Sequence, residues 1–301
     1  MHAVLIANPT AGRRQPDASP ERIAAMLRDA GLEVEVCTTA RRGDAVEFAR
    51  AAASHGADRI VIAGGDGTIS EVANGLIGQQ VPAAIIPCGT ANVLANELDL
   101  PQDVAEACNA AAAGRPRRID LGTCNGRAFF LAAGIGLDAA LVRAVPPNLK
   151  RRLGIAAYWI TAARVLPTVR AARYSLRIDG RSRSDSLFGA IVCGTRFYAG
   201  RYQMAPNARP DDGLLDLVLI HSCGRLNLLR AGLAMVTGRA ATCPLFESVP
   251  VQTVDCEAEP AAPVQLDGDD FGDTPVSIRL ESGAFTVIVP ATSDAPARPR
   301  T

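Results

Sequence analysis

Three glycines and one carboxylate follow a short apolar run near residue 64. The stretch Ile60–Val72 reads IVIAGGDGTISEV, so a strand-like segment ends in glycines before a helix-like pattern begins. Without Cβ atoms at Gly64, Gly65 and Gly67, the backbone can approach an anion closely. The N-terminus of the following helix would add N–H groups and a favourable dipole. This stretch therefore predicts a loop that binds phosphate.

Asp66 is the one residue of this loop that does not suit an anion by itself. A carboxylate repels phosphate unless a cation lies between them, so Asp66 suggests a magnesium ion, or a proton to be accepted. Thr68 is a suitable helix N-cap, and Glu71 would complete a capping box with it. An ordinary strand-to-helix turn is the alternative, but such a turn would not require three glycines around an acid.

Two further polar loops follow apolar runs. Asn8–Gly12 follows the run at 2–7, and Pro87–Asn92 follows the run at 83–86. Open parallel sheets bind ligands at the carboxyl ends of their strands, where such loops meet. We therefore expect these loops to face a common crevice with the glycine stretch.

A parallel sheet is expected to place these loops. Over the N-terminal part of the chain, apolar runs alternate with segments of helical apolar spacing, which is the βαβαβ pattern of such a sheet with right-handed crossovers. The expected strands are 2–7, 32–39, 59–63 and 83–86, and the expected helices are 20–30, 44–55, a segment ending near 76, and 104–113.

The pattern changes near residue 118 to short strands separated by turn residues, which is typical of an all-β region. Helical stretches near 150–166 and 226–237 interrupt it. The expected strands are 119–122, 128–132, 174–178, 187–193, 215–220, 276–280 and 285–289.

Composition limits the classes of function. The 301 residues carry a formal net charge of zero, which gives no electrostatic argument for a nucleic-acid partner. The eight cysteines include no Cys-x-x-Cys pair, so a reducing cytoplasm is the simple interpretation. No secretory h-region and no apolar run of about 18 residues is found, so we expect any membrane contact to be peripheral.

Three other glycine motifs are ambiguous by themselves. Gly134–Ala139 fits a dinucleotide G-x-G-x-x-A form, but no acid follows about 20 residues on, which disfavours nicotinamide binding. Asp267–Gly272 presents several carboxylates, yet Phe271 at the fifth position breaks the EF-hand pattern. Arg209–Asp216 is an acid-glycine turn for which an ordinary turn and a metal site are both open.

The ordered set of these motifs resembles the diacylglycerol kinase catalytic family, the bacterial soluble lipid kinases related to sphingosine and ceramide kinases. The resemblance covers nearly the whole chain and separates it from NAD kinases and phosphofructokinases. It is carried by Asn8-Pro9-x-Ala11-Gly12, Gly64-Gly65-Asp66-Gly67-Thr68 with Glu71-Val72 and Asn74-Gly75, Pro87-x-Gly89-Thr90-x-Asn92, Ile119-Asp120-x-Gly122, Gly134-x-Gly136-x-Asp138-Ala139, Asp212-Gly213-x-Leu215-Asp216, and Gln265-x-Asp267-Gly268-Asp269.

This resemblance implies a fold of two parts, of the NAD kinase/diacylglycerol kinase-like class. An α/β nucleotide-binding domain with a parallel sheet would span 1–121, and 284–291 could return to it. A β-sandwich domain for the lipid substrate would span 122–283, and 292–301 would be a disordered tail. ATP would bind in the cleft between the two domains.

The resemblance also implies the site residues. Asp66 and Asp120 would organise magnesium through water, and Asp212 would bind a structural magnesium with the carbonyls of Arg209 and Leu214. Thr39 would contact the nucleotide, in a Thr-x-x-x-Gly-Asp pattern. The nucleotide-binding set is Asn8, Thr10, Thr39, Gly64, Gly65, Asp66, Gly67, Thr68, Ile69, Ser70, Glu71, Gly89, Thr90 and Asn92.

Asp269 is the expected catalytic base, with Asp66 a further catalytic residue and Asp267 in an orienting role. Neighbouring carboxylates disfavour each other's ionised form, which favours proton acceptance in this turn. The family usually has Glu at the position of Asp269, and Asp at the position of Val93. Both departures leave the strength of catalysis open.

We expect an ATP- and Mg²⁺-dependent lipid kinase that phosphorylates a hydroxyl of a diacylglycerol-like or sphingoid lipid. A kinase of a soluble substrate, as in NAD kinases, and a catalytically weak nucleotide-binding regulatory protein are the alternatives. The expected location is cytoplasmic with peripheral membrane association, because Lys150–Arg152 precede an apolar and aromatic segment ending at Val165. A helix packed against the sandwich explains that segment equally well, and a homodimer is left open.

Overall fold

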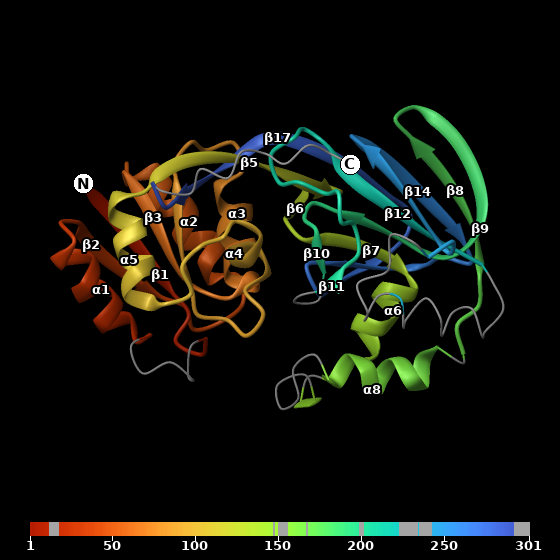
Figure 1. Cartoon of the computed structure of the whole chain (residues 1–301), viewed down its shortest axis with the longest axis horizontal. Helices are drawn as coiled ribbons and strands as arrows, with labels where there is room; N and C mark the ends of the chain where they lie inside the picture. The colour runs from red at the N-terminus through yellow and green to blue at the C-terminus, as the bar shows by residue number, and fades with distance from the viewer. Residues whose placement is uncertain are drawn as a thin grey trace. The chain divides into compact units, whose positions relative to one another are not determined.

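The protein is described by a computed structural model. It describes residues 1–11, 18–146, 148–149, 156–166, 168–198, 202–222, 234 and 243–291. The chain divides into two compact units (Figure 1): Met1–Ile119 with Gly283–Thr301, and Asp120–Ser282. The sequence analysis placed the boundary after residue 121 and the return near residue 284.

The N-terminal unit contains the predicted parallel sheet, in the strand order β17-β4-β3-β1-β2. Alternate residues of its strands face α1 and α5, which cover one side of the sheet with Ile23, Leu27 and Val104 in the shared core. The strands are β1 His2–Ala7, β2 Glu33–Thr38, β3 Arg59–Gly64, β4 Ala83–Pro87 and the end of β17 Val276–Val289. The helices are α1 Pro20–Asp29, α2 Asp44–Ser54, α3 Asp66–Leu76, α4 Val93–Glu97 and α5 Val104–Ala113.

Local signals set several helix limits in this unit. The side chain of Ser19 accepts a hydrogen bond from Arg22 N and caps α1, and Asp103 caps α5 in the same way. Gly75 of α3 lies so close to α2 that a Cβ there would be 2.6 Å from Val46 O. The two helices therefore pack closely only because residue 75 is glycine.

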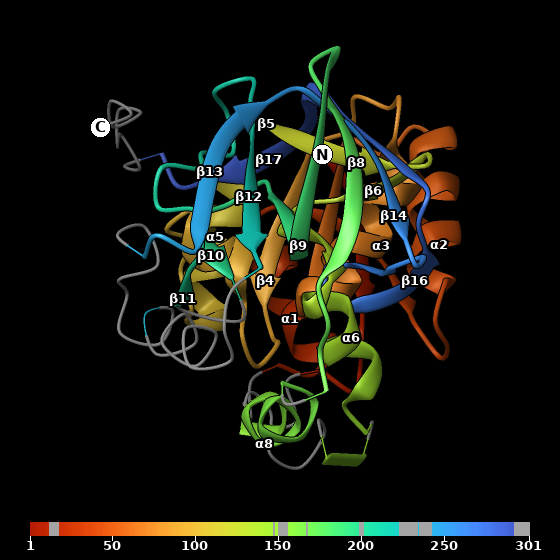
Figure 2. The ribbon, with the colours of Figure 1, turned by 90° about the vertical axis from the view of Figure 1, so that its right-hand side faces the viewer.

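The second unit is a β-rich sandwich, and its described residues include the helices α6 and α8. Strand β9 pairs with β7, β8 and β12, and Figure 2 shows β13, β12, β9, β8 and β14 side by side. Phe129 and Tyr174 are the largest side chains of its main core. Its elements are β5 Arg115–Cys124, β6 Arg127–Phe129, β7 Ala132–Gly136, α6 Leu137–Ala144, α8 Ala156–Val165, β8 Ala172–Ile178, β9 Arg181–Cys193, β10 Phe197–Tyr198, β11 Tyr202–Gln203, β12 Leu215–His221, β13 Phe246–Val251, β14 Thr253–Glu259, β15 Pro263–Leu266 and β16 Asp269–Asp273.

The fold class predicted from the sequence is confirmed, but some elements differ. The acidic stretch expected as a turn contains strand β16, which pairs only with β15 among the described strands. Asp and Gly are depleted in strands, so propensity gave no sign of it. The predicted helix 226–237, the cluster Lys150–Arg152 and the tail 292–301 lie outside the described residues apart from residue 234. No helix of the described parts combines the length and apolar character needed to cross a membrane.

Candidate functional site

Two glycine loops touch each other through their backbones in the N-terminal unit. The loops follow β3 and β4, which pair in parallel with Gly64 opposite Pro87. Cys88 N donates a hydrogen bond to Gly64 O at 2.9 Å. A Cβ on Gly89 would lie 2.6 Å from the Cα of Gly65, so only glycine allows this approach. The sequence predicted that these loops share one sheet edge, and the contact shows that they do.

Asp66 connects the first loop to the helix that follows the second. It is the first residue of α3, and its Oδ1 accepts a hydrogen bond from Leu94 N in α4 at 3.2 Å. Burial raises the pKa of Asp66 above its ordinary value, while the backbone N–H groups of Val93 and Leu94 act in the opposite direction. A partly buried carboxyl of this kind suits the binding of a cation or a proton.

Asn92 shapes the second loop from within. It has φ 47°, in the left-handed region that Asn tolerates, and its side chain is buried. Gly89 N donates to its Oδ1 at 2.8 Å, and its Nδ2 donates to Gln102 Oε1 at 3.3 Å. Asn92 therefore holds the loop that contains Gly89 and Thr90, which is a structural reason for an Asn here.

The polar residues after β1 reach the first glycine loop. Asn8 Nδ2 donates to Thr68 Oγ1 at 3.3 Å, and Asn8 Oδ1 accepts from the backbone N and the hydroxyl of Thr10 at 3.0 and 2.7 Å. The polar loops after β1, β3 and β4 thus meet at one edge of the sheet.

Thr39 lies at the same edge, where its backbone N donates to Ala7 O at 2.9 Å. The Thr-x-x-x-Gly-Asp pattern has a local explanation here. Asp44 Oδ2 accepts from the backbone N of Ala40 at 2.8 Å and of Arg41 at 2.9 Å, and Gly43 has φ 93°. The Asp and Gly of the pattern close the turn that follows Thr39.

The predicted capping box is wrong. Helix α3 begins at Asp66, its N-cap is Gly65, and no side chain makes a capping hydrogen bond. Thr68 is buried inside the first turn and packs against Gly64, where a Cβ would lie 2.6 Å from Thr68 Cβ. The helix begins at Asp66 and not at Ile69, so the glycines let the chain enter it three residues earlier than a threonine cap would. Ile69 and Ser70 are buried in α3 as well, and Glu71 lies on it.

The predicted magnesium residues Asp120 and Asp212 meet at one loop of the second unit. Gly213 N donates to Asp120 Oδ2 at 2.7 Å, and Asp120 N donates to Pro210 O at 2.6 Å. Asp212 Oδ1 accepts from Leu214 N at 3.2 Å. Within the described residues, no group of three or more His, Cys, Asp or Glu side chains could hold a metal. Magnesium at this loop would therefore need carbonyl and water oxygens besides its carboxylates, which the chemistry of the ion allows.

Asp267 anchors the acidic turn between β15 and β16. Its φ is 50°, and its carboxylate accepts hydrogen bonds from three consecutive backbone N–H groups, those of Phe130, Leu131 and Ala132. The distances are 3.0, 2.8 and 3.2 Å. This carboxylate fixes the turn to the segment before β7, and its predicted orienting role stays a prediction.

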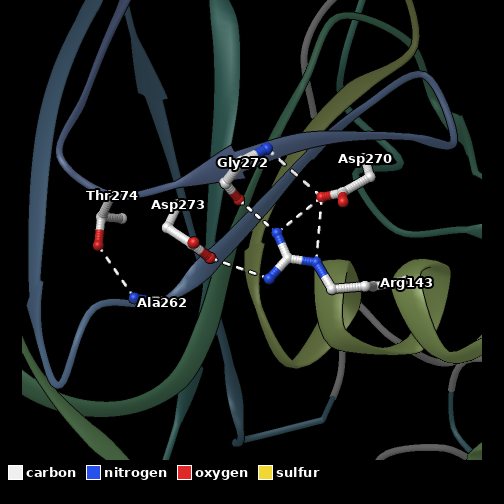
Figure 3. Close-up of polar contacts among 6 residues, drawn as sticks. All are labelled: Arg143, Ala262, Asp270, Gly272, Asp273 and Thr274. Carbon is white, nitrogen blue, oxygen red and sulfur yellow. Dashed lines mark hydrogen bonds and ion pairs between the residues drawn. The ribbon is translucent and has the colours of Figure 1, made fainter.

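Asp269 and Asp270 have different cationic partners. Arg127 Nη2 lies 3.6 Å from Asp269 Oδ2, whose side chain is 39% exposed. Arg143 of α6 donates to Asp270 Oδ1 at 2.7 Å and to Asp273 Oδ1 at 3.0 Å (Figure 3), and it lowers the pKa of Asp270. The prediction that crowding of carboxylates favours proton acceptance in this turn therefore has less support than expected. Successive side chains of a strand point to opposite faces, so Asp269 and Asp270 do not face each other.

Three site residues were missed by sequence reasoning: Asp138, Gln265 and Tyr198. Gln265 Nε2 donates to Asp138 Oδ2 at 2.8 Å, and Gly268 N donates to Gln265 Oε1 at 2.7 Å. The Tyr198 hydroxyl donates to Asp138 Oδ1. Burial raises the pKa of Asp138 to about 6, against the opposing hydrogen bond from Gln265. Asp138 and Gln265 stood in the recognised motifs, but nothing local linked them.

Gly134 explains the spacing of the motif that contains Asp138. A Cβ on Gly134 would lie 1.6 Å from Asp138 Oδ2, so this glycine makes room for the buried carboxyl. The G-x-G-x-x-A pattern serves the interior of the second unit here, and β7, which contains its glycines, pairs antiparallel with β9 and β15, unlike the parallel strands of a dinucleotide fold.

Comparisons with known proteins cover both units. The model of the diacylglycerol kinase catalytic domain matches residues 2–124, and that of the YegS C-terminal NAD kinase beta sandwich-like domain matches 132–289. The diacylglycerol kinase of Bacillus subtilis (strain 168) is 32% identical over 239 residues, covering 78% of this chain and 79% of that protein. A probable lipid kinase, YegS-like, of Chromohalobacter salexigens is 31% identical over 268 residues, covering 88% and 86%. A crystal structure of a diacylglycerol kinase from Bacillus anthracis has a TM-score of 0.80 at 27% identity, covering 96% of each chain.

Proposed function

Because the chain belongs to the diacylglycerol kinase catalytic-domain family, we propose that it is an ATP- and Mg²⁺-dependent lipid kinase. Its acceptor would be a hydroxyl of a diacylglycerol-like or sphingoid lipid. The observation that carries the proposal is the backbone contact between Gly65 and Gly89, which leaves two glycine loops side by side at the carboxyl edge of a parallel sheet.

The glycine loops are the proposed phosphate site. The first loop leads into α3 without a side-chain cap, so an anion can take the place of that cap. Asn8 and Thr68 are joined by a hydrogen bond at the same edge, and Thr10 and Thr39 lie with them. These hydroxyl and amide groups would orient the nucleotide, whereas the glycines supply close backbone approach.

Magnesium fits the carboxylates that the family resemblance assigns to it. Asp66 is a partly buried carboxyl whose Oδ1 accepts from Leu94 N, and Asp120 and Asp212 flank one loop. The carbonyls of Arg209 and Leu214 would complete the set at that loop. Bound magnesium would neutralise part of the phosphate charge as the γ-phosphoryl group moves.

Asp269 is the proposed base. The lipid hydroxyl oxygen would form a bond to the γ-phosphorus, the bond from that phosphorus to the β–γ bridging oxygen would break, and ADP would leave. The hydroxyl proton would pass to the Asp269 carboxylate. Asp267 and its three backbone donors would hold the turn still while this happens.

The test is incubation of the purified chain with γ-labelled ATP and magnesium, against a panel of lipids and NAD. Label in a diacylglycerol, phosphatidylglycerol or sphingoid product supports the proposal and names the acceptor. Label in NAD alone would make the protein a kinase of a soluble substrate. ATP binding without transfer to any acceptor would support the regulatory alternative.

We also propose peripheral contact with a membrane through α8. Ile160 on this helix is 42% exposed, one of few large apolar side chains at the surface of the described residues. The basic cluster Lys150–Arg152 precedes the helix in sequence. Reversing the charge of this cluster should weaken binding to anionic vesicles by about 1 kcal/mol per residue at low salt, and unchanged binding with normal activity would contradict this role.

A further inference from the structure

Hydrogen bonds and ion pairs of side chains hold the β15–β16 hairpin at three places within the second unit. At its open end, Thr274 N donates to Ala262 O at 2.8 Å, and Ala262 N donates to Thr274 Oγ1 at 3.0 Å. Along its side, Arg143 of α6 bonds Asp270 and Asp273, as Figure 3 shows. The third place is the turn itself, which is held by hydrogen bonds of the Gln265 side chain.

Two hydrogen bonds of Gln265 in β15 connect α6 to the turn. Asp138 of α6 accepts from Gln265 Nε2, and Gln265 Oε1 accepts from Gly268 N. Gly268 is the residue directly before Asp269, so this bond holds the backbone from which the Asp269 side chain projects. Asp138 is 5% exposed and Gln265 is 1% exposed.

The two ends of the Gln265 amide have opposite requirements. Its NH₂ group faces a carboxylate, and its oxygen faces a backbone N–H. Asp138 is buried and the bond to Gly268 N is partly buried, and an unmatched polar group costs more there than at the surface. The direction of this hydrogen-bond chain is therefore specified, and Gln satisfies both ends without taking up a proton.

We propose that Asp138 and Gln265 are positioning residues for phosphoryl transfer, because they hold the turn at the place where Asp269 accepts a proton. This inference rests on the proposed function. Neither residue touches the lipid or ATP in this account. They act through Gly268, and misplacing a catalytic group by about 1 Å can cost about 10²-fold in rate.

Arg143 provides a matched contrast on the same helix and hairpin. Its side chain is 40% exposed, and those of Asp270 and Asp273 are 52% and 53% exposed. Exposed ion pairs of this kind contribute little. Its guanidinium also bonds residues beyond Asp269, on the far side from the turn.

The test is an exchange of hydrogen-bond direction. Gln265→Glu puts a second carboxylate against Asp138 and should lower kcat by roughly 10- to 100-fold, with KM for ATP close to wild type and the melting temperature lowered by the buried like charges. Adding Asp138→Asn should recover kcat to within about threefold of wild type. In the double variant, Asn at 138 donates to Glu at 265 and still accepts from Tyr198, while Glu at 265 accepts from Gly268 N.

Arg143→Gln is the control and should change kcat by less than about threefold, since it breaks only exposed pairs. Equal losses in Gln265→Glu and Arg143→Gln would overturn the proposal, because general loosening of the hairpin would then be the cause. A normal kcat in Gln265→Glu would overturn it too. If Gln265→Glu does not fold, the double variant decides: activity near wild type supports the pair, and an inactive or unfolded double variant overturns it.

Failure of this inference can be told from failure of the proposed function. A wild-type protein that labels no lipid overturns the proposed function. A wild-type protein that labels lipid, together with a fully active Gln265→Glu variant, overturns only the positioning role.

Discussion

The glycine loops of the N-terminal unit and the acidic turn of the second unit are built in opposite ways. The loops are shaped by missing side chains: Gly65 and Gly89 meet backbone to backbone, and a Cβ at either would crowd the other. The turn is shaped by side chains from distant segments. Asp138 and Gln265 are separated by 127 residues of sequence, and Asp267 is 137 and 136 residues from its backbone donors Phe130 and Leu131. The proposed phosphate site in the loops requires room for an anion, whereas the proposed base Asp269 requires a fixed orientation.

The same contrast appears in burial and charge. Asp66 in the loops is partly exposed and Asp138 behind the turn is buried, and desolvation raises the pKa of both carboxyls. The carboxylate of Asp66 accepts a hydrogen bond from a backbone group, Leu94 N. The carboxylate of Asp138 accepts hydrogen bonds from two side chains, those of Gln265 and Tyr198. Five predictions, each with its own variant and some with a matched control, test whether this difference has the expected consequences.

The largest effect is expected for Asp66→Asn, which should abolish activity with the fold intact. Asn keeps the size of Asp and an oxygen that can accept from Leu94 N, but it removes the negative charge that would hold a cation. Steady-state kinetics measure the loss of activity, and a melting curve measures whether the fold is intact. More than about a tenth of the wild-type rate, a loss of only about 1.4 kcal/mol of transition-state stabilisation, would show that Asp66 is not central.

Asp269→Asn should lower kcat by about 10²- to 10⁴-fold with little change in ATP affinity, since it removes a proton acceptor and leaves the loops untouched. Asp269→Glu is the matched variant and should retain or raise activity. Near-normal kcat in Asp269→Asn together with an inactive Asp267→Asn would move the base to Asp267 or Asp66.

The stability contribution of Asp138 should fall as the pH rises. Its pKa is about 6 in the folded protein against 3.8 for an ordinary Asp, so folding favours the protonated form. The contribution is complete below about pH 3.8 and is lost as pH rises through 6. The gap of about two units corresponds to about 3 kcal/mol.

Urea unfolding of wild type and Asp138→Asn measures this effect, because the contributions of other groups cancel in the difference. The free energy of unfolding of the wild type should decrease relative to the variant by about 3 kcal/mol between pH 3.5 and 7.5. A difference that does not change with pH would show that Asp138 does not titrate in this way.

Gly89→Ala should destabilise the N-terminal unit by about 1–3 kcal/mol, the usual range for overpacking, and weaken ATP binding. The new Cβ would lie 2.6 Å from backbone at Gly65. Gly67→Ala is the stability control, because no atom lies within 4 Å of its added Cβ and Ala suits a helix better than Gly. Equal melting temperatures for Gly89→Ala and wild type would contradict the packed contact.

The smallest effect is expected for Asp212→Ala. If its loop binds magnesium, a tenfold excess of the ion over its Kd should stabilise wild type by about 1.4 kcal/mol, and the variant should lack this gain. Melting curves with magnesium and with a chelator give the comparison. Identical shifts in wild type and variant would count against a cation at this loop.

The sequence by itself determined the features that depend on neighbouring residues. Apolar runs followed by glycines predicted β1, β3 and β4 and the loops after them, since backbone freedom and burial are read locally. The order of the motifs was enough for the family and the two-part fold. One local rule failed at Thr68, because Gly65 lets α3 start earlier than the cap rule expects.

The tertiary structure alone decided the features that join distant segments. The Gly65–Gly89 contact, the three N–H donors to Asp267 and the chain from Asp138 through Gln265 to Gly268 all depend on strand pairing and on α6 beside β15. Strand β16 exists because β15 pairs with it, against the propensity of its Asp and Gly residues. Hydrogen-bond partners more than 100 residues apart leave no periodic signal in a sequence, and only the folded backbone brings them within 3 Å.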